Sequence, residues 1–293
     1  MCNRLKYINK VPDQFHNDEN YIKNTIDYFC NKMKIKSRIC IKFIDNADLD
    51  KYTDKNEYEE TDCLLKSYSV ERHELIITNS VLNSISFDGG DHFCLSIYHE
   101  LKHIEDFINM MNTKLFDFNF CKVRQKNFEQ QYISTGYLFW TEIYAYYETI
   151  YVANINKIKY EKITFSRLVK NYRKTIDLDK QFYYKQDLTY DEAVKYINSV
   201  KSFIYLCAKF MASFYVKHSK VPISKIEKDK DYKRVYSILC GLEPKVRRLL
   251  NNSYSKKSYD NLFKLGKQIC ENIQWKIFNV GLVKSKGSVT TFY

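Results

Sequence analysis

The stretch His99-Glu100-Leu101-Lys102-His103 has the residue types and the spacing of a metal site on a helix. Residues four apart on an α-helix lie one above the other on the same face, so both imidazoles can reach one ion. Histidine nitrogen is a preferred ligand of Zn²⁺, and Glu100, about 100° around the helix from His99, can take a proton from a water on the metal. The pattern predicts zinc at His99 and His103 with Glu100 as general base; the alternative is two solvated histidines on an exposed face.

The residues around this stretch have the periodicity of a helix that packs against a core. Asp88-Gly89-Gly90 is a predicted turn before it, and Asp91 is the predicted N-cap. Apolar residues then recur at spacings of three and four, as in an amphipathic helix: Phe93, Ile97, Leu101, Ile104, Ile108 and Met111.

Before this helix the sequence predicts a helix over 17–34 and a strand over 38–44. In that strand Ile39, Ile41 and Phe43 would share one face, because side chains alternate between the two faces of a sheet. A second strand is predicted over 73–78. We expect this strand at the edge of the sheet, with His73 facing solvent and not binding the metal.

A predicted helix from about Leu138 to Ile155 carries the candidates for a third metal ligand. Glu142, 39 residues after His103, would complete a His₂Glu set that leaves a fourth position for water, as catalytic zinc requires. Glu148 is the competitor on another face of the same helix, and the alternative for Glu142 is a surface carboxylate. The small Ala145 would let this helix approach the metal helix closely.

The sequence leaves the roles of several other side chains near this site undecided. Asp106 follows His103 by about one turn and either orients its imidazole or is solvated. A developing oxyanion needs a hydrogen-bond donor besides the metal. The candidates, which the sequence leaves unranked, are Tyr144, Tyr146, Tyr147 and His218.

The segment 99–103, followed by Trp140-Thr141-Glu142-Ile143-Tyr144-Ala145, resembles the gluzincin metallopeptidases, and most of all the ImmA/IrrE type. The resemblance covers about residues 35–155 and implies an α+β fold, with a small zincin-like sheet and the HExxH helix followed by an all-helical C-terminal half. It implies that Zn²⁺ is held by His99, His103 and Glu142. It also implies that peptide bonds of an intracellular protein substrate are hydrolysed, with Glu100 activating the zinc-bound water. Families of this type often act on transcriptional regulators, an analogy that gives one candidate substrate.

Composition indicates a globular protein made mostly of helices. The 293 residues are 45% hydrophobic, with only 7 Gly and 3 Pro, which favours long helices over a β-sandwich. We expect a zincin-like metallopeptidase domain at 1–157 and a basic helical domain at 158–293. In the latter, predicted helices cover 159–176, 188–218, 229–239, 244–250 and 256–277, with a break at Gly241 to Pro244.

The sequence predicts a cytoplasmic protein without a membrane partner. The most apolar run, Ser202 to Val216, is too short to span a bilayer, and no signal peptide is evident at the N-terminus. The 9 cysteines form no C-x-x-C pair and are expected to be reduced thiols.

Charge is unevenly distributed along the chain. Residues 1–150 contain 18 Lys+Arg and 23 Asp+Glu, a balance of −5, whereas residues 151–293 contain 29 and 12, a balance of +17. The basic half predicts either a Lys-rich solvated surface or an anionic partner such as nucleic acid. Two alternatives to a peptidase therefore stay open: a catalytically silent zinc-binding regulatory module, and a basic nucleic-acid-binding helical protein with an incidental HExxH.

Overall fold

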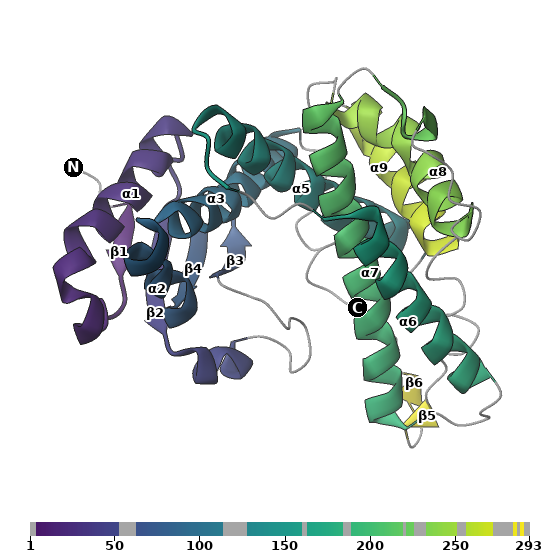
Figure 1. Cartoon of the computed structure of the whole chain (residues 1–293), viewed down its shortest axis with the longest axis horizontal. Helices are drawn as coiled ribbons and strands as arrows, with labels where there is room; N and C mark the ends of the chain where they lie inside the picture. Colours follow the sequence, from purple (N-terminus) through teal and green to yellow (C-terminus); the bar gives the residue numbers. More distant parts are fainter. Residues whose placement is uncertain are drawn as a thin grey trace. The chain divides into compact units, whose positions relative to one another are not determined.

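The computed structural model describes residues 4–52, 63–113, 128–159, 163–183, 189–218, 221–225, 233–250, 256–271, 284–285 and 288–289. Within these ranges the chain is mostly helical, with a small four-stranded mixed sheet, so the fold class is α+β (Figure 1). The contacts divide it into two compact units: residues 1–112 with 148–160, and residues 113–147 with 161–293. The boundary passes through one continuous helix, α5 (Phe128–Ile155). The predicted domains 1–157 and 158–293 stay a prediction.

The first unit contains the sheet. Its strands are β1 (Leu5–Tyr7), β2 (Arg38–Ile44), β3 (Cys63–Ser69) and β4 (Arg72–Thr78), in the order β1-β2-β4-β3. β1 and β4 are parallel to β2, whereas β3 and β4 pair antiparallel through a tight turn. The strand predicted over 38–44 is confirmed, but the prediction that β4 is an edge strand is wrong. β3 covers that edge, because the hairpin brings it alongside β4.

Within its described residues this unit also contains three whole helices, α1 (Glu19–Lys32), α2 (Asn79–Asp88) and α3 (Asp91–Asn112), and the end of α5. The predicted alternation in β2 is confirmed, because Ile39, Ile41 and Phe43 all lie in the core. That core also contains residues of the three helices and of β4, among them Ile22, Ile26, Leu75, Ile77, Val81, Phe93, Ile97 and Leu101. Short 3-10 helices span Asp13–Asp18 and Asn46–Lys51.

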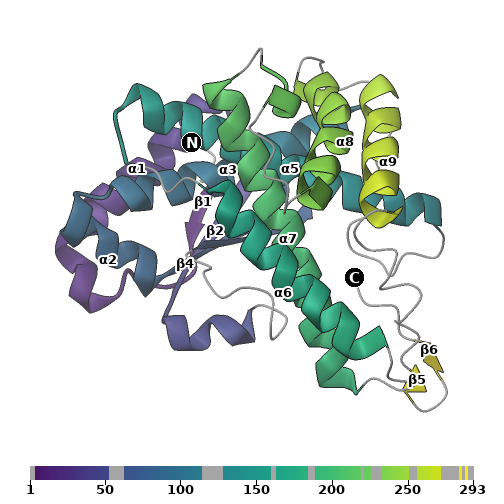
Figure 2. The same ribbon diagram turned by 45° about the vertical axis from the view of Figure 1, so that its right-hand side comes forward.

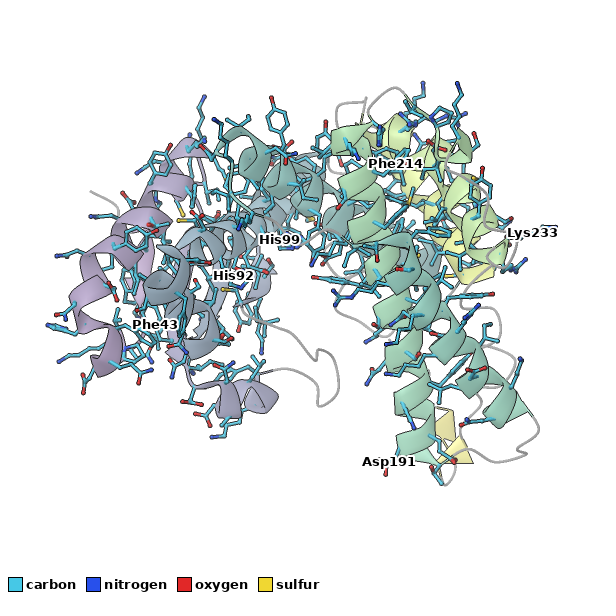
Figure 3. The ribbon with its side chains drawn as sticks, viewed as in Figure 1. Phe43, His92, His99, Asp191, Phe214 and Lys233 are labelled. Atoms are coloured by element: carbon cyan, nitrogen blue, oxygen red, sulfur yellow. The ribbon has the colours of Figure 1, made fainter. Side chains whose placement is uncertain are left out.

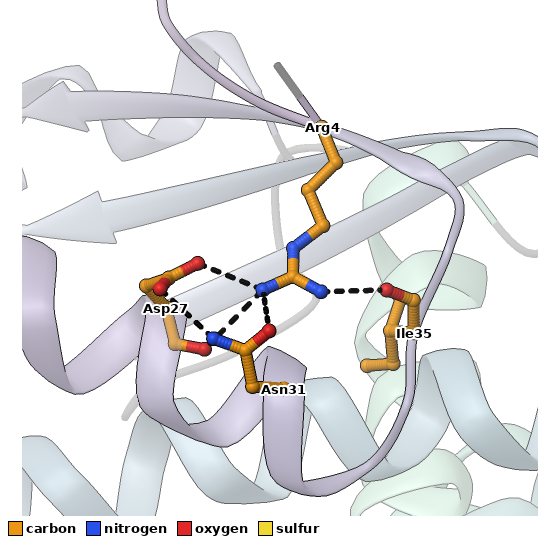
Figure 4. A network of polar contacts seen from close by, with 4 residues as sticks. All are labelled: Arg4, Asp27, Asn31 and Ile35. Atoms are coloured by element: carbon orange, nitrogen blue, oxygen red, sulfur yellow. Dashed lines mark hydrogen bonds and ion pairs between the residues drawn. The ribbon is translucent and has the colours of Figure 1, made fainter. Parts of the chain in front are cut away.

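A polar network joins the start of the chain to α1 (Figure 4). The guanidinium group of Arg4 donates to Asp27 Oδ1 at 2.7 Å, to Asn31 Oδ1 at 2.6 Å and to the Ile35 carbonyl at 3.1 Å. Arg4 therefore holds the beginning of β1 against the C-terminal end of α1, which places β1 for its parallel pairing with β2.

In the residues that the structure describes, the second unit is helical apart from a two-residue pairing of β5 (Lys284–Ser285) with β6 (Ser288–Val289). Figures 1 and 2 show α6 alongside α7, and α8 alongside α9. Their bounds are α6 (Phe165–Tyr183), α7 (Tyr190–Lys217), α8 (Lys233–Leu250) and α9 (Lys256–Ile269), with a 3-10 turn at Ile223–Lys225. None of the helices in the described ranges is long and apolar enough to cross a membrane.

The predicted break at Gly241 to Pro244 is wrong, because α8 continues through both residues. A proline inside a helix removes one backbone donor, and the buried face on either side of Pro244, including Leu239, Leu242 and Val246, keeps the helix packed. At Gly241 a Cβ would lie 2.2 Å from Gln268 Nε2 of α9, the end of a flexible side chain that can move aside.

Candidate metal centre

The metal helix α3 begins after a glycine turn. Gly89 and Gly90 have φ angles of 71° and 88°, a left-handed conformation that ends α2. The Asp88 carboxylate accepts hydrogen bonds from the Gly90 and His92 backbone N–H groups at 3.0 and 3.2 Å. Asp91 is the first residue of the helix, so its predicted role as N-cap is wrong, and Asp88 satisfies the N-terminal donor instead.

The predicted apolar stripe holds α3 against the core. Phe93, Ile97, Leu101 and Ile104 are fully buried, and Met110 takes the buried position that was expected of Met111. This packing fixes the rotation of the helix about its axis. The row that carries His99 and His103 is thereby placed beside the core and not in open solvent.

His99 and His103 lie together as the spacing predicts. His99, marked in Figure 3, is buried at 8% exposure, and His103 is half-buried. Their Nε2 atoms are 3.1 Å apart, with the rings perpendicular at 88°. Two nitrogens bound to one tetrahedral zinc at about 2.0–2.1 Å would be roughly 3.3 Å apart. The pair therefore fits a shared metal ion, and the alternative of two solvated histidines on an exposed face is wrong.

Glu142 of α5 completes the cluster. One nitrogen from each histidine and one carboxylate oxygen of Glu142 all lie within 4.8 Å of one another. Glu142 is half-buried, so its carboxylate is not an ordinary surface group. A metal ion between two imidazoles and one carboxylate would keep a fourth position for a water or a substrate oxygen.

The competing carboxylate, Glu148, has a different partner. Its Oε2 atom is 3.4 Å from Lys102 Nζ, and the same ammonium group donates to Glu105 Oε2 at 2.6 Å. Lys102 is only 7% exposed and lies 5.5 Å from the centre of the Tyr98 ring. Burial alone would lower the pKa of Lys102, but the Glu105 hydrogen bond and the Glu148 charge outweigh burial and raise it. Lys102 is therefore charged inside the protein.

Two acidic neighbours of the histidines differ in burial. Glu100 is half-buried beside His99, and its predicted role as general base stays a prediction. Asp106 is fully buried, with 0% exposure, so the alternative that it is solvated is wrong. Its predicted role in orienting His103 stays a prediction.

The candidate oxyanion donors lie in different surroundings. The Tyr146 hydroxyl donates to the Tyr205 hydroxyl at 2.6 Å, and its ring is 5.1 Å from Lys209 Nζ. Tyr144 packs beside Trp140 and Tyr147 is half-buried. The structure thus adds Tyr205 of α7 to the surroundings of α5. Sequence reasoning missed it because no local pattern relates residues 59 positions apart. His218 ends α7, with its ring 5.1 Å from that of Phe214.

The prediction that His73 faces solvent is wrong. Its side chain is fully buried, on the sheet face that carries Leu75 and Ile77, and its ring packs edge-on at 6.0 Å against Phe107 of α3. Ser67 Oγ and His73 Nδ1 share a hydrogen bond of 2.9 Å. The alternation of β4 already contained this signal, because residues 73, 75 and 77 share one face. His73 is not in the metal cluster.

No family model matches the sequence, and no match was found among the curated proteins or the solved structures.

Proposed function

We propose that the protein is a zinc-dependent metallopeptidase whose metal is held by His99, His103 and Glu142. One observation carries this proposal: three residues of the types and spacing that suit catalytic zinc have their ligand atoms within 4.8 Å of one another. Two of these residues are four apart on α3, and the third comes from a separate helix 39 residues later. The spacing of the two histidines does not by itself require a carboxylate beside them, so the placement of Glu142 adds support to the proposal.

The chemistry follows from the donor set. Bound zinc would act as a Lewis acid that polarises a carbonyl group and lowers the pKa of a water molecule. Glu100 follows His99 directly, and in the proposed reaction it takes the proton from the attacking water and then gives it to the leaving amine. The two imidazoles must stay neutral to bind metal, so binding weakens at acidic pH.

The substrate class rests on resemblance. The HExxH segment and the Glu142–Ala145 spacing resemble those of the ImmA/IrrE-type gluzincins. We therefore propose an intracellular protein or peptide substrate, with transcriptional regulators as the first candidates to test. Ala145 is fully buried, which suits the close helix packing expected of a small residue at that position.

Metal content and hydrolysis together test the proposal. Elemental analysis should find about one zinc per chain in the wild type and in His16→Ala, and none in His99→Ala; His16 is an exposed histidine that serves as the matched control. Glu100→Gln should keep the zinc and lose cleavage of a fluorogenic peptide library by at least 10²-fold.

Three results would contradict it. Wild-type protein without metal after purification and zinc addition would show that the histidines do not form a site. Undiminished hydrolysis by Glu100→Gln would remove Glu100 as general base. Zinc without any hydrolysis across the library and candidate regulators would favour the regulatory zinc module instead.

A further inference from the structure

Lys102 is an unusual residue to find between two metal-ligand positions. It lies one residue before His103 and three after His99, yet it is 7% exposed. Lysine is rarely buried unless it is paired, because the ammonium group loses strong hydration. Its carboxylate partners Glu105 and Glu148 and the Tyr98 ring compensate for this loss. A leucine would fill the same space without requiring charged partners.

The two carboxylates near Lys102 differ in what they connect. Glu105 is on α3, three residues after Lys102, so that pair stays within one helix turn. Glu148 is on α5 at 3.4 Å, so the second pair joins α3 to α5. α5 is the helix that also carries Glu142.

The geometry of α5 relates Glu148 to Glu142. Six residues separate them on one continuous helix, so they project about 120° apart around its axis and roughly 9 Å apart along it. Ala145 lies midway between them in angle, and it is fully buried. The two carboxylates therefore flank a closely packed face of α5, one directed to the histidines and the other to Lys102. Fixing the position of one sets the rotation of the helix, and with it the position of the other.

We infer that Lys102 is a positioning residue for the metal centre: by binding Glu148 it fixes the rotation of α5, presents Glu142 to His99 and His103, and prevents Glu148 from competing as a ligand. This inference rests on the proposed function, since it assigns the means by which the third ligand is selected. Groups that orient metal ligands change metal affinity by about 10–100-fold when they are removed.

Zinc affinity across a set of variants tests the inference. Lys102→Met keeps the bulk of the side chain and removes the charge, and Glu148→Gln removes the charge of the other partner at a position that is 28% exposed. Both should weaken zinc binding, measured by competition with a chelator, by about 10–100-fold. Lys102→Arg should keep the zinc affinity within a few-fold of the wild-type value, because a guanidinium group can still reach Glu148. Glu105→Gln is the matched control, and its affinity should change by less than about 3-fold.

Cobalt spectra separate positioning from simple stability. The visible absorption of Co²⁺ in the site reports coordination geometry, so Lys102→Met and Glu148→Gln should change the band shape, whereas Glu105→Gln should not. Glu148→Gln covers the case in which Lys102→Met fails to fold. Wild-type binding and spectrum in Glu148→Gln would overturn the inference while leaving the zinc site intact. Absence of zinc binding in the wild type would instead overturn the proposed function.

Discussion

At the scale of single residues, His73 shows how burial changes the chemistry of a side chain. Burial lowers its pKa from the usual 6.5 to about 4, against a smaller opposite effect of a hydrogen bond with the Val70 backbone. In the unfolded chain the imidazole takes up a proton below about pH 6.5, whereas in the folded protein it stays neutral until about pH 4. The unfolded state therefore binds more protons between these values, and stability falls as the pH is lowered through that range.

The size of this effect can be measured with His73→Gln. A pKa of about 4 in place of 6.5 corresponds to at most about 3.4 kcal/mol of unfolding free energy, lost between pH 6.5 and pH 4. We expect urea unfolding of His73→Gln to show a pH dependence that is shallower by about this amount. His16→Gln, at an exposed histidine, should retain the wild-type slope. Equal slopes for the wild type and His73→Gln would show that His73 is not neutral in the folded protein.

At the scale of elements, α5 and α9 cross at two glycines. A Cβ at Gly266 would lie 1.6 Å from the Tyr132 carbonyl oxygen, and one at Gly136 would lie 2.0 Å from that of Leu262. Distances this short cannot be relieved by rotating a side chain, because the atoms that are met belong to the backbone. The helices therefore contact each other through their main chains. This close contact, which only glycine permits, holds α5, the helix that carries Glu142, against α9.

Gly266→Ala should consequently destabilise the protein strongly. Overpacking usually costs about 1–3 kcal/mol, and a backbone collision should reach or exceed the upper value. Gly89→Ala is the control: its φ of 71° imposes strain of about 1 kcal/mol, but a Cβ there meets nothing within 4 Å. The two variants are compared by their urea unfolding midpoints, provided that their m-values equal that of the wild type. A Gly266→Ala loss no larger than that of Gly89→Ala would contradict the close crossing of α5 and α9.

The sequence pattern predicts some of the helices and strands and misses others. Periodic stretches were predicted well: α1, the strand Arg38–Ile44, the buried face of α3 and the long α7 all lie where the pattern indicates. β1 and β3 were missed because neither has a strong alternation of its own. Each depends on pairing with a distant strand. The unbroken α8 was missed for a related reason, since tertiary packing overrides the weak breaking signal of one glycine and one proline.

At the scale of the whole molecule, the candidate site combines local and distant information. The spacing of His99 and His103 is local to a helix turn, so the sequence was enough to propose the pair. The choice of Glu142 over Glu148 depends on how α5 is rotated, and the ion pair between Lys102 and Glu148 spans 46 residues without any sequence signature. The spacing within a helix therefore predicts the histidine pair, whereas the tertiary contacts determine which carboxylate lies beside it.

Metal binding should also be visible in the stability of the whole chain. The proposed ion would be held by residues of both α3 and α5, so its binding should stabilise the folded chain. A ligand at about 100 times its dissociation constant stabilises the folded state by about 2.7 kcal/mol if the unfolded chain does not bind it. For a chain of this length that corresponds to an increase in Tm of roughly 5 °C.

Differential scanning calorimetry of metal-free protein with and without zinc measures this increase. Glu142→Gln should show a smaller shift at the same zinc concentration, because two imidazoles alone hold the ion weakly, and magnesium should produce none, because it prefers oxygen ligands. An equal zinc shift in the wild type and in a His99→Ala/His103→Ala variant would mean that zinc binds elsewhere on the chain. The geometry of α3 and α5 predicts the opposite result, because the ligand atoms that this variant removes are those that lie within 4.8 Å of one another.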